Sequence, residues 1–246
     1  MRLPGFLLLI LLLIADVTSS QTVDVPSPSA TNLPMVRPAL LARGPTSLVN
    51  TIDTKDLIKK GQKDAAIMFY SIVTDTGNIL VSATYRGTPG SKLLEEEVRK
   101  RLASAKFIPA IHARQPVAVF FYGTVVFGVV DGKPRLRIFS NQQLEELKKE
   151  SDFIDPQPYF GGDSKFEGFH YPETGSPVQV TGTAALALNV DAEGNLKDIR
   201  LVSEYPPLLG FGDAAVFDLE KAKFIPAFRN GQPVESKVTL SIYFKP

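Results

Sequence analysis

The side chains best suited to acid-base chemistry or metal binding are few in this chain. It has two histidines, His112 and His170, and no cysteine. The two histidines are far apart in the sequence, and neither belongs to a pair with the spacing of metal ligands. We therefore predict no metal site, and we expect His112 to occupy a tolerant position at the surface.

A short acidic segment superficially resembles a calcium-binding loop. It runs through Asp191, Ala192, Glu193, Gly194 and Asn195. Its glycine comes too early for such a loop, and the late bidentate glutamate is missing, so a hairpin turn explains the segment better. The sequence also lacks a nucleophile elbow, a phosphate-binding loop and a dinucleotide fingerprint. We predict a protein that is not an enzyme, with no catalytic residue, no cofactor and no evident small-molecule substrate.

The overall charge excludes another class of partner. Lys and Arg number 27 against 26 Asp and Glu, so no strong field would attract nucleic acid. The content of apolar residues, 44%, is that of an ordinary folded protein, and the length suits about two modest domains.

The N-terminus has the pattern of an export signal. Arg2 precedes an apolar run over residues 6–15, and small and polar residues follow up to Ser20. This pattern predicts a signal peptide at residues 1–20 and a periplasmic or secreted mature chain. The alternative is an uncleaved segment that anchors the protein in the inner membrane. Five prolines at positions 26–45 then indicate an extended linker over residues 21–45.

An internal repeat organises the remaining chain. The phrase AKFIPA begins at Ala105 and recurs 117 residues later at Ala222. Further identities at the same offset include Gly77 with Gly194, and the Gln-Pro-Val runs that begin at Gln115 and Gln232. We interpret residues 64–130 and 181–246 as two copies of one module.

Each copy shows the pattern of the same elements. Strands are expected at 66–73 and 79–85 around a Gly-Asn turn, then a helix at 91–105 and a long final strand. The second copy repeats this order with strands at 183–190 and 196–202 and a helix at 213–222. The predicted fold is therefore α+β, with two tandem β-β-α-β modules, each an antiparallel sheet with a helix packed on one face. A first module with flanking helices and a hairpin spans 46–150, an aromatic-containing connector spans 151–180, and the second module spans 181–246.

Seven residues of the repeat are predicted to have structural roles. The phenylalanines should fill the core beneath each helix, the prolines should end a pairing segment at the corner, and the glycines should form turns. They are Phe107, Pro109, Gly77, Phe224, Pro226, Gly194 and Gly231.

The two predicted sheets differ in how much cover they need. Residues 119–130 are apolar on both faces, so the first sheet should be covered on both sides, either from within the chain or by another protein. The aromatic side chains of residues 151–178 should wrap one of the modules and fill its grooves, since a free linker would not carry so many.

The second copy resembles the C-terminal domain of TonB-type energy transducers. The resemblance runs through Val190 to Leu196, the Lys223 to Ala227 phrase, the Asn230-Gly231-Gln232-Pro233-Val234 turn and the terminal strand. It implies a periplasmic β-β-α-β domain that binds partners at its sheet edge. The first copy matches more weakly, with Ala113 and Arg114 in place of Asn-Gly.

This resemblance makes the last strand the candidate partner-binding edge, because the backbone of an edge strand can pair with an incoming peptide. We expect a protein or peptide partner of the cell envelope, for example an outer-membrane receptor. Two alternatives stay open: a membrane-anchored energy transducer for outer-membrane transport, and a structural envelope protein that self-associates, for example as a homodimer. The candidate residues are Lys237, Val238, Thr239, Leu240, Ser241, Ile242 and Tyr243.

Overall fold

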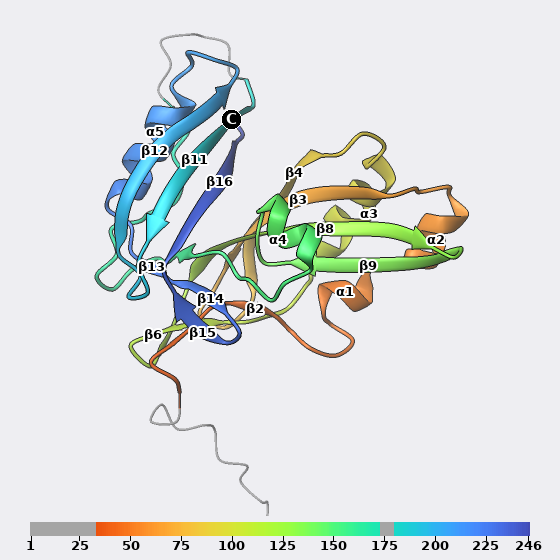
Figure 1. The fold of residues 1–246 in the computed structure, drawn as a ribbon, viewed down its shortest axis with the longest axis horizontal. Helices are drawn as coiled ribbons and strands as arrows, with labels where there is room; N and C mark the ends of the chain where they lie inside the picture. Colours follow the sequence, from red (N-terminus) through yellow and green to blue (C-terminus); the bar gives the residue numbers. More distant parts are fainter. Residues whose placement is uncertain (1–32, 173–179) are drawn as a thin grey trace, which may run out of the picture.

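The computed structural model describes residues 33–172 and 180–246, and the ribbon shows two sheets set side by side (Figure 1). The expected signal peptide at 1–20 and part of the expected linker lie outside the described residues. The first sheet is antiparallel with the order β4-β3-β8-β9. Its strands are β3 (Ala65–Val73), β4 (Ile79–Gly87), β8 (Val119–Val130) and β9 (Lys133–Phe139).

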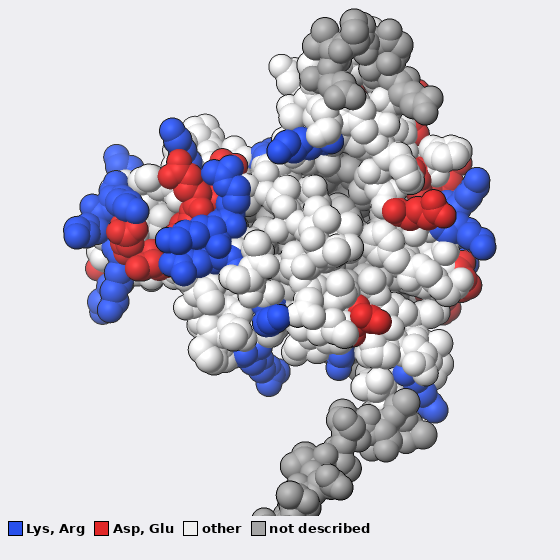
Figure 2. Space-filling model, turned by 180° about the vertical axis from the view of Figure 1, so that it is seen from behind, with Lys and Arg blue, Asp and Glu red and all other residues white. Residues whose placement is uncertain are grey.

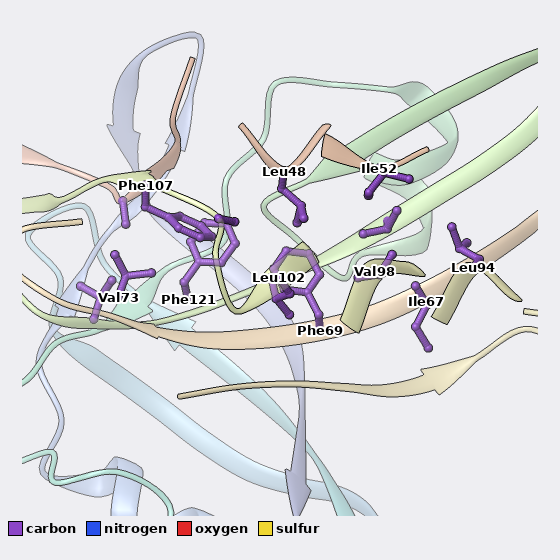
Figure 3. Close-up of a cluster of buried hydrophobic side chains, with 14 of the residues drawn as sticks. Leu48, Ile52, Ile67, Phe69, Val73, Leu94, Val98, Leu102, Phe107 and Phe121 are labelled. Carbon is purple, nitrogen blue, oxygen red and sulfur yellow. The ribbon is translucent and has the colours of Figure 1, made fainter. Parts of the chain in front are cut away.

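One face of the first sheet is covered by α3 (Lys92–Leu102). Leu94, Val98 and Leu102 lie one helical turn apart and are buried, because this stripe of the helix packs on the sheet. Figure 3 shows this stripe facing Phe69 and Ile67 of β3, with Leu48 and Ile52 close by. Leu48 belongs to the short helix α1 (Leu48–Thr51), Ile52 follows it, and the short helix α2 (Thr54–Lys59) adds Leu57 to the same core.

The second sheet has three antiparallel strands in the order β12-β11-β16. They are β11 (Gly182–Val190), β12 (Leu196–Tyr205) and β16 (Ser236–Phe244). Buried and less buried residues alternate along β11, as expected for a sheet covered on one face. That cover is α5 (Phe211–Glu220), which packs Phe211, Ala215 and Leu219 into the core.

Short paired segments follow each helix. In the first half they are β5 (Phe107–Ile108), β6 (Ala110–His112) and β7 (Gln115–Val117). In the second half they are β13 (Phe224–Ile225), β14 (Ala227–Arg229) and β15 (Gln232–Val234). The turn between β14 and β15 and the turn between β6 and β7 both contain residues with positive φ.

The segments before each sheet, which are the expected linker and the connector, pair with short strands that follow the helices. Within the expected linker, β1 (Val36–Arg37) pairs with β6 and β2 (Leu40–Leu41) pairs with β5. Within the connector, β10 (Gln157–Pro158) pairs with β13. Backbone hydrogen bonding therefore ties both segments to the repeated phrase.

Each of the two hydrophobic cores contains residues from the other half of the chain. The first core takes in Ile225 and Phe228 from the second half of the chain, and the second core takes in Phe120 and Tyr122 from β8. The aromatic connector contributes to both, with Tyr159 in the first core and Phe166 in the second. Both faces of the first sheet are thus covered from within the chain, because the second half and the connector pack against the face opposite α3.

Charged side chains gather at one end of the molecule. Figure 2 shows Lys, Arg, Asp and Glu interspersed over the lobe that carries α2, α3 and β9, while much of the remaining visible face is uncharged. Within the described ranges, no helix combines the length and the apolar character needed to cross a membrane.

Candidate functional site

The repeated phrase closes over the Gly-Asn turn in each half of the chain. The backbone N–H of Phe107 donates to the carbonyl oxygen of Gly77 (2.9 Å), and that of Phe224 donates to Gly194 (3.0 Å). Both glycines have positive φ. A Cβ at Gly77 would lie 2.1 Å from the carbonyl oxygen of Phe107, and a Cβ at Gly194 would lie 1.9 Å from that of Phe224. Only glycine fits these two positions without displacing backbone.

Four of the remaining predicted structural residues lie at or next to this contact. Phe107 and Phe224 are buried. Pro109 lies between β5 and β6 near Gly77, and Pro226 lies between β13 and β14 near Gly194. Gly231 differs from the other two glycines, since its φ is positive but a Cβ there would meet no atom within 4 Å. Its role is therefore conformational only.

The predicted partner-binding residues all lie in β16, at one edge of the second sheet. On one side β16 pairs with β11 over its whole length, from Gly182 opposite Phe244 to Val190 opposite Ser236. On the other side no strand of the described chain pairs with it. Because backbone groups alternate along a strand, those of Lys237, Thr239, Ser241 and Tyr243 face away from β11.

The middle of this edge is occupied by glutamine side chains. Gln143 Nε2 donates to Thr239 O (3.0 Å), and Gln143 Oε1 accepts from Thr239 N (3.4 Å). Gln142 Oε1 accepts from Ser241 N (2.9 Å). Two side-chain amides thus make the hydrogen bonds that a neighbouring strand would make.

Tyr85 of β4 completes the cover at Ser241. Its hydroxyl donates to Ser241 O (3.0 Å) and accepts from Gln142 Nε2. Its ring stacks on that of Tyr243, with centroids 5.8 Å apart and planes inclined by 9°. The first sheet therefore contacts the β16 edge directly, and burial raises the pKa of the Tyr85 hydroxyl, so it stays protonated as a donor.

Three hollows follow β16 from one end to the other. One of about 380 Å³ adjoins Ser236 and Lys237, one of about 450 Å³ adjoins Thr239 and Ser241, and one of about 540 Å³ adjoins Ser241 and Tyr243. Gln143 lines both the first and the second hollow, Arg86 lines both the second and the third, and Tyr85 lines the third. The edge thus borders a groove that a few side chains interrupt.

A buried carboxyl group supports the segment that carries the glutamines. Asp155 is 1% exposed, and its Oδ2 accepts from the backbone N–H of Gln142 (3.0 Å). Burial raises the pKa of Asp155 to about 7, and the charge of Glu146 adds to this effect, although the hydrogen bond from Gln142 opposes it. Its Oδ1 has no hydrogen-bond partner within the described residues.

The two histidines lie away from this groove. His112 stacks on Tyr159 with centroids 4.6 Å apart, so its position is more constrained than the expected tolerant surface site. His170 Nδ1 lies 2.8 Å from Asp218 Oδ1, and this contact raises the pKa of His170. Over the part of the chain that the structure describes, no three His, Asp or Glu side chains form a group that could hold a metal ion.

The acidic segment at Asp191 forms a turn. Asp191 Oδ1 accepts from the backbone N–H groups of Glu193 (3.1 Å) and Asn195 (2.7 Å). These bonds use the carboxylate within its own loop, as in an Asx turn.

The β16 side of the groove lies in the part of the chain that matches a family model, and the side that carries Tyr85, Gln142 and Gln143 does not. Residues 167–246 match the family model described as Gram-negative bacterial TonB protein C-terminal. The match contains β11, β12, α5 and the whole of β16, and residues 1–166 lie outside it. Neither the curated proteins nor the solved structures contain a significant match to this chain.

Sequence reasoning located β16 but missed the residues that cover it. Gln142 and Gln143 lie in a short polar run between β9 and α4 (Leu144–Lys149). Tyr85 lies within β4, and nothing in the sequence distinguishes it from the other residues of that strand. No sequence pattern predicts that these three residues contact Thr239 or Ser241, because the contacts depend on how the two sheets pack.

Proposed function

We propose that this chain is an exported, non-catalytic binding protein of the cell envelope. Its second module holds an extended segment of a partner protein, which adds as a further strand at the β16 edge. The proposal is supported by the family match over residues 167–246, since domains of this kind bind proteins in the periplasm.

The observation that carries the proposal is the pairing of side-chain amides with the β16 backbone. Thr239 offers both of its backbone groups to Gln143, and Ser241 offers its N–H to Gln142. An edge that accepts amide groups in this way also suits the peptide groups of an added strand. The hollows along β16 provide room for its side chains.

We further propose that the chain carries two copies of one module. Both halves have the same order of strands and helix, and the same Gly-Phe hydrogen bond recurs 117 residues apart. The pairing of Leu40 with Ile108 recurs as Gln157 with Ile225, which supports a repeat that begins before each sheet. In this interpretation the first module supports the second and covers its edge.

A crosslinking experiment tests strand addition. The chain has no native cysteine, so a single cysteine introduced at Lys237 can carry a photoreactive crosslinker. A cysteine at Arg200, on the opposite edge strand β12, is the matched control. In a cell-envelope extract, we expect an adduct from position 237, little adduct from position 200, and loss of the first adduct in a Thr239→Pro background.

Thr239 is the informative position for proline because its N–H faces away from β11, whereas proline at Leu240 would remove an N–H that faces β11. Equal adducts from positions 237 and 200, or an adduct that survives Thr239→Pro, would contradict strand addition at β16.

A further inference from the structure

The middle of the β16 edge is closed by a segment of the same chain, which we call the plug and define as Gln142 and Gln143. The side-chain amide of Gln143 contacts both backbone groups of one residue, Thr239, as a paired strand does. With Tyr85, the plug satisfies all the outward backbone groups of Thr239 and Ser241.

The backbone of the plug is held firmly, so only its side chains reach the edge. The neighbouring Asn141 is fully buried, its Nδ2 donates to Phe153 O (2.8 Å), and its carbonyl oxygen accepts from Thr124 (3.0 Å). Beyond the plug, α4 is held by an ion pair between Glu146 and Arg229 (2.7 Å). Opening the edge at Thr239 therefore requires rotation of the Gln143 side chain and no movement of a strand.

The two ends of the edge are different. For the outward backbone groups of Lys237 and Tyr243, the described residues provide no hydrogen-bond partner, and a hollow adjoins each end. A strand could pair there first and then replace the glutamine amides in the middle. Each bond that it forms at Thr239 or Ser241 must replace one that the chain already makes, which lowers the net gain.

We infer that Gln142 and Gln143 are an internal competitor that occupies the β16 edge until a partner strand displaces them. This inference rests on the proposed function. It predicts that the native chain binds a strand more weakly than a chain without the plug, roughly tenfold if one to two net hydrogen bonds are released.

The test uses the full chain and a fluorescent peptide with the sequence of Ser236–Phe244. Such a peptide can pair antiparallel with β16 with Leu240 opposite its own copy, so that Thr239 faces Ser241 across the pair. A peptide with proline at the position of Ser241 is the control ligand. Gln142→Ala/Gln143→Ala removes the plug, and Gln115→Ala/Gln232→Ala alters two exposed glutamines as the control protein.

We expect the plug variant to bind the peptide roughly tenfold more tightly than the native chain and the control protein, with faster hydrogen exchange at the Thr239 and Ser241 amides. Because Gln142 is buried, Gln143→Ala alone serves as a milder variant if the double variant unfolds.

Equal peptide affinity in the native chain and the variants would overturn the inference while leaving strand addition standing. Unchanged exchange at Thr239 and Ser241 would overturn it as well. Faster exchange without peptide binding by any of the proteins would show that the glutamines only protect an edge, and it would count against strand addition too.

Discussion

The backbone N–H of Phe224 donates to the carbonyl oxygen of Gly194; Gly194 lies in the turn between β11 and β12, and Phe224 follows α5. Lys223 Nζ reinforces the contact by donating to Asn195 Oδ1 (2.7 Å). The same arrangement joins Phe107 to Gly77 and Lys106 to Asn78. The repeated Lys-Phe pair and the repeated Gly-Asn pair are therefore two parts of one contact, which accounts for their recurrence in the sequence.

Alanine at Gly194 should destabilise the protein strongly. A Cβ would lie 1.9 Å from Phe224 O at a residue with φ of +86°, so both steric overlap and backbone strain oppose it. We expect a loss of about 2–4 kcal/mol in the free energy of unfolding, measured by urea denaturation. Gly231→Ala is the matched control, because its φ is +72° but a Cβ has space; it should cost about 1 kcal/mol. Equal losses at the two positions would contradict the role given to Gly194.

The buried Asp155 should make stability depend on pH. Its pKa is about 7 in the folded protein and 3.8 ordinarily, so the folded state retains a proton that the unfolded state releases. The free energy of unfolding should therefore fall as pH rises from about 4 to about 7, by roughly 1.4 kcal/mol per pH unit at most, and then level off.

In Asp155→Asn, the side-chain oxygen can still accept the hydrogen bond from the Gln142 backbone N–H, and the amide does not titrate. We expect this variant to be more stable than the native chain at pH 8 and to lose most of that slope in urea denaturation. The other titratable groups near Asp155 are Tyr85, Tyr122 and Glu146, and burial raises the pKa of both tyrosine hydroxyls, so they stay neutral in this range. An unchanged slope in the variant would assign the pH dependence to other groups.

The contact between His170 and Asp218 should be visible by NMR titration. Asp218 is buried, and its hydrogen bond and charge raise the pKa of His170 above the ordinary value of 6.5. Stability from this contact is present at low pH and is lost as pH rises through the raised pKa. In Asp218→Asn, the His170 pKa should move back toward its ordinary value, while His112 serves as the internal reference in the same spectra. A His170 pKa that does not change in the variant would contradict the assignment.

Local patterns in the sequence predicted much of the fold. The alternation of apolar and polar residues over 183–190 and the Gly-Asn turn predicted β11 and the start of β12, and the structure has these strands at Gly182–Val190 and Leu196–Tyr205. The prolines indicated an extended linker at 21–45 but not its pairing, in which Val36–Arg37 and Leu40–Leu41 pair with short strands near the repeated phrase. Two-residue strands leave no periodic signal, so the sequence could not indicate them.

The sequence by itself determined the order of the long strands and the two long helices and placed a candidate binding strand at the C-terminus, because turns and alternation are local properties of the chain. Only the tertiary structure decided that this edge is closed. Gln143 reaches Thr239 across 96 residues, Gln142 reaches Ser241 across 99, and Tyr85 reaches Ser241 across 156. Contacts of this kind arise when two sheets pack together, and no spacing of residue types along the chain specifies them.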